Sequence, residues 1–199
     1  MGAFFQSLGR TVAAGVVLLV VILLAVGAFV SEAGARPGDH MWWAFVMRWL
    51  HVLSGVMWVG LLWYFNFVQT PSMPKIPDEQ KPAVSKVIAP TALFWFRWAA
   101  LSTVVTGLMV AGMNGYLASA LMLTKGVHAI GIDMWIALVM AFNVWFVIWP
   151  NQKKALGIVT VTAEEKAAAA KLAGLVSRIN TMLSIPMLFC MVAQQNVGM

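Results

Sequence analysis

His51 is the residue whose type and position most clearly call for a chemical explanation. It lies in an apolar run, RWLHVLSGVMWVGLLWYFN, that is typical of a membrane-spanning helix. An imidazole in hydrocarbon is costly without a partner, so such a residue usually faces a bundle interior, a cavity or a cofactor. On a helix, His51 shares one face with Arg48, Gly55 and Trp58. The glycine would leave room for a flat ligand, and the tryptophan would separate that ligand from lipid. The sequence therefore predicts a cofactor site around His51.

His128, near the start of a later apolar run, is the predicted partner of His51. Haem iron takes axial imidazole ligands, and a haem between membrane helices is held from both sides at similar depth. We therefore expect haem b with His51 and His128 as iron ligands, and propionates near the cations Arg48 and Lys125. The alternative is that both histidines only form hydrogen bonds within the bundle. Directly bound iron, copper or zinc is disfavoured, because Asp133 points about 140° away from His128 around the helix.

A second polar group is expected toward the opposite side of the membrane. Arg97 lies well inside a third apolar run, and Asn143, Arg178 and Asn180 lie at comparable depth in later runs. We expect Arg97 to act as an internal hydrogen-bonding clamp with the two asparagines. The functional alternative is a site for an anion or a quinone headgroup, or a charge that tunes the haem potential.

The composition places these residues in an integral membrane protein. Of 199 residues, 61% are hydrophobic and only 10% are charged, and the mean hydropathy is +0.85. The net charge of +6 comes from lysines between the apolar runs, which indicates membrane topology and no nucleic-acid binding. The single cysteine, Cys190, excludes an intrachain disulfide framework, a cysteine-based zinc site and a CxxCH haem attachment.

The apolar runs predict an all-α membrane protein with one domain, residues 1–199. We expect four helices to form a bundle and the first helix to be peripheral. The five expected transmembrane helices are residues 12–30, 41–68, 87–112, 127–149 and 172–193.

Two connections and one alternative complete this prediction. Residues 70–86 read as a proline-rich loop, and Pro150 should end the fourth helix. Residues 113–127 are apolar enough for a short helix, and 151–171 read as a soluble helical connection. The first run could instead be a signal peptide, since Ala33-Gly34-Ala35 resembles a cleavage site, but the run is long for that role.

The lysines also predict an orientation. Arg10 and the lysines of residues 75–86 and 153–171 fall on one side of the membrane, whereas the opposite connections hold only Arg36 and Lys125. By the positive-inside rule the N-terminus is cytoplasmic and the C-terminus is outside. His51 and His128 then both lie toward the outer half.

Four segments resemble the membrane domain of bacterial cytochrome-linked urate oxidase. They are RWLHVLSGVMWVG, PTALFWFRWAALSTVVTG, NVWFVIWPNQKK and SRINTMLSIPMLF. The resemblance implies a multi-pass protein of the bacterial inner membrane, related to an enzyme that oxidises urate and sends the electrons into a fused cytochrome c domain. This sequence has no CxxCH motif, so we expect it to lack that domain.

The predicted function is electron transfer by a membrane protein that binds haem b, with a cytochrome c or a larger redox complex as partner. One alternative, which rests on the resemblance alone, is a urate oxidase-like enzyme that passes electrons to a separate cytochrome c. Another is a non-redox accessory subunit of a membrane complex.

Overall fold

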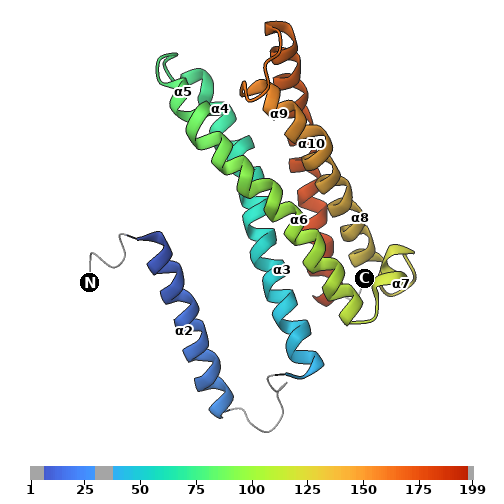
Figure 1. Ribbon diagram of the computed structural model, residues 1–199. Helices are drawn as coiled ribbons and strands as arrows, with labels where there is room; N and C mark the ends of the chain where they lie inside the picture. Colours follow the sequence, from blue (N-terminus) through green and yellow to red (C-terminus); the bar gives the residue numbers. More distant parts are fainter. Residues whose placement is uncertain (1–6, 30–37, 197–199) are drawn as a thin grey trace. The chain divides into compact units, whose positions relative to one another are not determined.

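The computed structural model describes residues 7–29 and 38–196, and the regular structure of these residues is entirely helical (Figure 1). Among these described residues, five helical segments are long and apolar enough to cross a membrane. They are Leu8–Ala25, His40–Lys75, Lys81–Met113, His128–Ala155 and Ala163–Gln194. This confirms the predicted all-α membrane fold. The chain divides into two compact units, Met1–Trp42 and Trp43–Met199.

The first unit contains helix α2, Leu8–Phe29, which begins a little before the predicted start at residue 12. Its apolar sequence, with no proline, allows one uninterrupted helix. The Ala33-Gly34-Ala35 segment that resembles a cleavage site lies outside the described residues. The peripheral position of this helix stays a prediction.

The second unit is built from four long helical segments, three of which contain local changes of helix type. In chain order its elements are α3 (His40–Trp63), η1 (Tyr64–Gln69), α4 (Thr70–Ser72), η2 (Met73–Lys75), α5 (Lys81–Ala83), η3 (Val84–Ile88), α6 (Ala89–Met113), α7 (Leu117–Leu121), α8 (His128–Phe142), η4 (Asn143–Ile148), α9 (Trp149–Ala155) and α10 (Ala163–Asn196). The short helix α7 confirms the helical expectation for residues 113–127.

Three of these helices pass through a proline by means of a π-helical turn. The elements η1, η3 and η4 are π-helical, and each ends two residues before a proline, namely Pro71, Pro90 and Pro150. In each case the backbone N–H of the residue before the proline donates to the carbonyl five residues back. Proline removes a helical hydrogen bond and clashes with the preceding turn, and the wider turn accommodates both effects.

These π-helical turns account for the main differences from the predicted helix ends. The second helix continues to Lys75 and the third begins at Lys81, so only residues 76–80 remain of the expected 70–86 loop. Likewise, the fourth helix does not end at Pro150 and runs on to Ala155. The fifth begins at Ala163, because the alanine-rich stretch that we expected to be a separate connection continues directly into it.

The centre of the bundle is apolar and closely packed. Its largest fully buried side chains are Trp58, Leu62, Phe96, Met140, Ile148 and Val144, together with the polar Asn180 and Ser184. Hydrogen bonds between helices supplement this packing: Trp63 Nε1 donates to Ser184 Oγ at 3.0 Å and Asn66 Nδ2 donates to Ser177 Oγ at 2.8 Å. Such polar contacts are a usual means of helix association in membranes.

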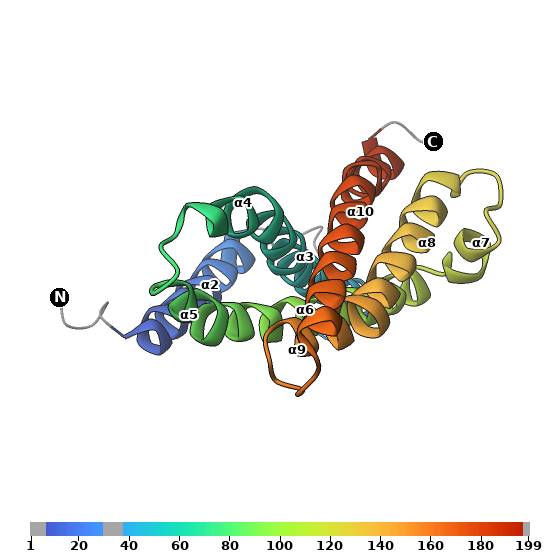
Figure 2. The same cartoon turned by 90° about the horizontal axis from the view of Figure 1, so that it is seen from above.

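The two ends of the bundle differ in their connections. The connections 76–80 and 156–162 lie at one end, the lysine-bearing end, which is flanked by Lys75, Lys81, Lys153, Lys154 and Lys166, whereas α7 lies at the other (Figure 1). Seen from above, α10 runs beside α8, and α7 packs against α8 on the side away from α10 (Figure 2). A Cβ added at Gly131 in α8 would collide with the Ala120 carbonyl oxygen, so this glycine permits the close approach of α7. The connection through α7 thereby brings Tyr116 to the end of the bundle where His51 lies.

Candidate functional site

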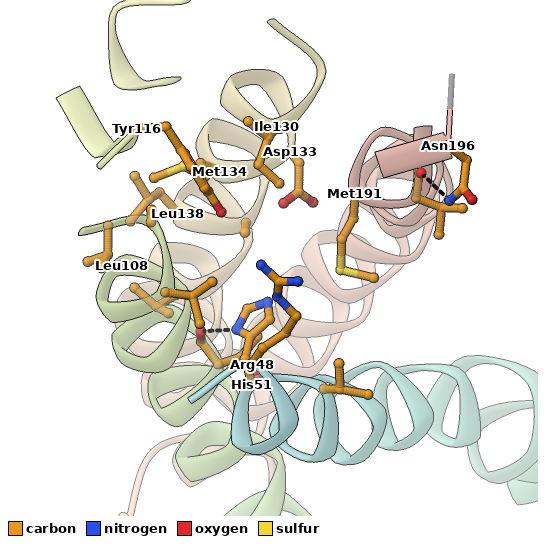
Figure 3. Close-up of a pocket in the computed structure, with 18 residues that line it drawn as sticks. Arg48, His51, Leu108, Tyr116, Ile130, Asp133, Met134, Leu138, Met191 and Asn196 are labelled. Carbon is orange, nitrogen blue, oxygen red and sulfur yellow. Dashed lines mark hydrogen bonds between the residues drawn. The ribbon is translucent and has the colours of Figure 1, made fainter. Parts of the chain in front are cut away.

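A cavity of about 210 Å³ lies between α3, α6, α8 and α10 at the α7 end of the bundle (Figure 3). Its charged and hydrogen-bonding residues come from four elements and the α6–α7 connection. They are Arg48, His51, Thr103, Tyr116, Asp133 and Asn196. Most of the remaining lining is aliphatic or methionine. An apolar cavity with a few convergent polar groups is the usual form of a small-molecule site.

The His51 ring is held in one orientation by helix α6. Its Nδ1 lies 2.9 Å from the carbonyl oxygen of Thr103 and 3.3 Å from Thr106 Oγ1. Because a carbonyl oxygen can only accept, Nδ1–H is the donor. In the neutral ring Nε2 then carries the lone pair, and it makes no hydrogen bond to another described residue. His51 therefore offers the cavity a nitrogen that can accept a proton or bind a metal.

Gly107 creates the space in which this ring lies. A Cβ added at Gly107 would lie 2.8 Å from His51 Cε1 and 3.1 Å from His51 Nδ1. Gly55, which the sequence suggested as the space for a ligand, instead faces α6, where an added Cβ would meet Thr103 Cγ2 at 3.9 Å. The glycine that matters for His51 therefore comes from the neighbouring helix.

Asp133 is the only buried charged side chain among the described residues, with 8% of its surface exposed. It lines the cavity and forms no ion pair or hydrogen bond with any of those residues. Figure 3 shows its carboxylate across the cavity from the Arg48 guanidinium, which lies beside the His51 ring. The cavity therefore has the Asp133 carboxylate on one side and the Arg48 guanidinium on the other, and the two groups form no direct ion pair.

Tyr116 lies within the electrostatic influence of both charges. Burial raises the pKa of its phenol, while Arg48 lowers it and Asp133 raises it further. Tyr116 is thus neutral at physiological pH and can donate or accept a hydrogen bond at the cavity.

The structure does not bring the two predicted iron ligands together. His128 is exposed at the start of α8 and does not line the cavity, and Lys125 is likewise exposed outside it. The helical geometry explains this, because residues five apart point about 140° away from each other, and Asp133 is the one that faces the cavity. Trp58 is fully buried in the core and is also absent from the lining.

The second predicted polar group has different partners from those expected. Asn143 Nδ2 donates to Asn180 Oδ1 at 2.8 Å, and Asn180 Nδ2 donates to the Met140 carbonyl at 3.0 Å. Arg97 takes no part in this pair: its guanidinium carbon lies 3.7 Å from the centre of the Trp149 ring. Its Nη1 is buried without a hydrogen-bond partner among the described residues. The clamp therefore consists of the two asparagines, and Arg97 makes a cation–π contact beside it.

Arg178 is exposed and lines a smaller cavity of about 80 Å³ at the lysine-bearing end. Its polar neighbours there include Asn66, Gln69 and Ser177, and the Gln69 Oε1 atom is buried without a partner. The space suffices for a few water molecules, which would satisfy this oxygen.

Sequence reasoning missed four residues that shape the main cavity, namely Thr103, Gly107, Tyr116 and Asp133. Asp133 carried a usable signal, because an acidic residue inside a membrane helix is a functional candidate in its own right. The other three became recognisable only once the helices were packed against one another.

The cavity favours a small planar molecule over a haem. Its volume lies below the roughly 300–1,000 Å³ of sites for drug-sized ligands, and a haem would need it to open. Only one histidine lines it, and the Asp133 carboxylate would repel the haem propionates. In favour of a haem, metal-bound histidines usually donate the other ring N–H to a carbonyl or carboxylate, as His51 does.

Comparison with known proteins supports one relationship. Residues 116–197 match the family model described as urate oxidase N-terminal. The match covers less than half of the chain and confirms the resemblance over that segment, which contains Tyr116, Asp133 and Met191 of the cavity. The chain matches no curated protein and no solved structure.

Proposed function

We propose that this membrane protein is a urate oxidase-like oxidoreductase that binds a small planar heterocycle such as urate in the His51 cavity. The family match over residues 116–197 supports the type of reaction. The observation that carries the proposal is the cavity itself, which combines a hydrogen-bonded histidine, a cation and a buried carboxylate in an apolar surrounding.

The cavity groups suit the chemistry of urate. At neutral pH urate is a planar anion with carbonyl and ring N–H groups. Arg48 can bind the anionic edge in the plane of its guanidinium, and His51 Nε2 can accept a proton from a ring nitrogen. Oxidation removes two electrons from the ring together with protons on nitrogen. The electrons pass one at a time to a c-type cytochrome, and the protons pass to His51 and then to water.

The orientation of the bundle is consistent with such an acceptor. The lysine-bearing end lies opposite the cavity, so by the positive-inside rule we expect the cavity toward the outer face. In a bacterial inner membrane, with the N-terminus cytoplasmic and the C-terminus outside, the site would meet a cytochrome c of the periplasm.

Haem b is the second candidate for the same cavity, and the hydrogen bond from His51 Nδ1 to Thr103 favours it. His51 would hold the iron and Arg48 a propionate, and the bound haem would supply one-electron transfer. His128 has no part in this version, because it lies outside the cavity. A non-redox accessory subunit would neither bind haem nor oxidise urate.

The test uses full-length protein purified in detergent from haem-sufficient cells. Two readouts are measured: the reduced-minus-oxidised spectrum with pyridine haemochrome quantification, and urate-dependent reduction of added cytochrome c. The variants form matched pairs, His51→Gln with His128→Gln and Arg48→Gln with Lys125→Gln. In each pair the first residue lines the cavity and the second does not.

Urate-dependent reduction that is lost in His51→Gln and Arg48→Gln, but kept in the two control variants, would support the oxidoreductase. A b-type spectrum that disappears only in His51→Gln, without urate activity, would favour the haem carrier. A colourless protein that leaves cytochrome c oxidised would contradict both and favour an accessory subunit.

A further inference from the structure

Asp133 takes no part in the proposed anion binding or proton transfer, and its surroundings are unusual. It lies inside the membrane-spanning segment His128–Ala155, and only 8% of its surface is exposed, so more than nine-tenths of the residue is buried. No described residue donates a hydrogen bond to it or lies within 4.0 Å as a salt-bridge partner. Ionisable groups at membrane depth are costly unless something in their cavity satisfies them.

The other groups that face the cavity do not fill this role. From α6, Thr103 Oγ1 donates to the Ala99 carbonyl at 2.7 Å, and Thr106 Oγ1, which lies outside the cavity lining, donates to the Ser102 carbonyl at 2.6 Å. From α10, Asn196 Nδ2 donates to the Val192 carbonyl at 2.9 Å. The threonine hydroxyls and this amide are thus engaged within their own helices. The charged and titratable groups around Asp133 are Arg48 and His51 from α3 and Tyr116 from the α6–α7 connection.

A carboxylate in this position is an acceptor that requires a donor from within the cavity. Arg48 provides charge on the opposite side without direct contact, so a ligand that fills the space between the two could bind both. A molecule that satisfies both must present an N–H group on one edge and an anionic or carbonyl edge on the other. Flat nitrogen heterocycles of the purine type have this arrangement.

We propose that Asp133 is a specificity-determining residue that accepts a hydrogen bond from a ring N–H of the ligand. The cavity then selects heterocycles whose N–H edge lies opposite the edge bound by Arg48, and it rejects analogues in which that nitrogen is methylated. This inference rests on the proposed function, since it concerns the same cavity and the same class of ligand.

The experiment measures the dissociation constants of urate and its four N-monomethylated derivatives by equilibrium binding to purified protein. Wild type is compared with Asp133→Asn, which keeps the size of the side chain, and with Asp133→Glu, which keeps the carboxylate. Asp78→Asn is the matched control, because Asp78 is exposed outside the membrane-spanning segments and is bound to Lys81.

One methylated position should weaken binding to wild type and to Asp78→Asn by roughly 10- to 100-fold, which corresponds to the loss of one hydrogen bond to a charged group. Asp133→Asn should discriminate much less between that derivative and urate, and Asp133→Glu should restore part of the discrimination. If Asp133→Asn does not fold, wild type is compared with Asp133→Glu alone. The measured quantity is the ratio of the dissociation constants of that derivative and urate, which should be smaller in Asp133→Glu than in wild type.

The possible failures are distinguishable. Wild type that binds urate and all four derivatives equally, or an Asp133→Asn protein with unchanged discrimination, would overturn the role of Asp133 and leave the proposed function standing. Wild type that binds neither urate nor its derivatives would overturn both.

Discussion

The His51 ring of α3 packs directly on Gly107 of α6. It occupies the space that any side chain at position 107 would need. An added Cβ at Gly107 would lie 2.8 Å from the ring. This contact and the hydrogen bond to Thr103 come from adjacent turns of α6, and together they fix the direction of His51 Nε2.

Gly107→Ala should therefore displace the ring of His51 and impair the site. We expect a loss of about 1–3 kcal/mol in the free energy of unfolding, since the methyl group overpacks a filled space. Urate-dependent reduction of cytochrome c should also fall, because the displaced His51 ring no longer points its Nε2 into the cavity. Gly60→Ala in α3 is the control, because apart from the adjoining backbone of its own helix no atom lies within 4 Å of its added Cβ. Equal behaviour of the two variants would show that His51 has room to move.

The Asn143–Asn180 pair should contribute to stability independently of the cavity. Asn143→Leu removes the donor to Asn180 Oδ1, which is fully buried. We expect a cost of about 0.6 kcal/mol, the average for hydrogen bonds between membrane helices, and at most about 1.7 kcal/mol, measured by unfolding in mixed detergents. Asn114→Leu should cost less, because Asn114 is exposed and bound only to its own helix. A smaller loss for Asn143→Leu than for Asn114→Leu would contradict this role.

The stacking of Arg97 on Trp149 should depend on the flat shape of the guanidinium. Arg97→Lys keeps the charge but loses the planar group, so we expect a destabilisation of about 0.5–2 kcal/mol. A double-mutant cycle with Trp149→Leu measures the coupling. If the effects of the two substitutions simply add, the 3.7 Å contact contributes no interaction energy.

Tyr116 should ionise above its ordinary pKa of about 10, because burial favours the neutral phenol. The corresponding stability is present below about pH 10 and is lost as the pH rises through the raised pKa. The near-ultraviolet absorbance of tyrosinate reports this ionisation, and Tyr64→Phe leaves Tyr116 as the only tyrosine. Added to that background, Arg48→Gln should raise the pKa further and Asp133→Asn should lower it. If the pKa of Tyr116 is the same in both variants as in the Tyr64→Phe background, Tyr116 does not feel the charges of Arg48 and Asp133.

The sequence was sufficient to predict the helices and the main histidine. Long apolar runs separated by lysine-containing segments lead directly to five helices that could span a membrane, and the isolated histidine within one of them, His51, lines a cavity. The helix ends were predicted less well, because a proline usually ends a helix and the π-helical turns before Pro71 and Pro150 were not foreseen.

The partners of the site residues could not be predicted in the same way. The pairing of His51 with His128 assumed that two histidines at similar depth face each other, but the rotation of α8 turns Asp133 toward the cavity. Likewise, Arg97 was matched to Asn143 by depth alone, whereas the packing places it on Trp149. Depth along a helix follows from counting residues, but the direction of a side chain depends on how each helix is rotated in the bundle.

The π-helical turns before the three prolines also shift the phase of each helix. One additional residue per turn advances the following side chains by about 100° relative to an uninterrupted α-helix. A helical wheel drawn through all of α6 and its preceding turns would therefore assign the residues before Val84 to the wrong stripe. On either side of such a turn, the residues that face a neighbouring helix therefore follow two different stripes. Deleting one residue from the turn would rotate the side chains at the lysine-bearing end about the helix axis. The side chains around the His51 cavity would keep their directions.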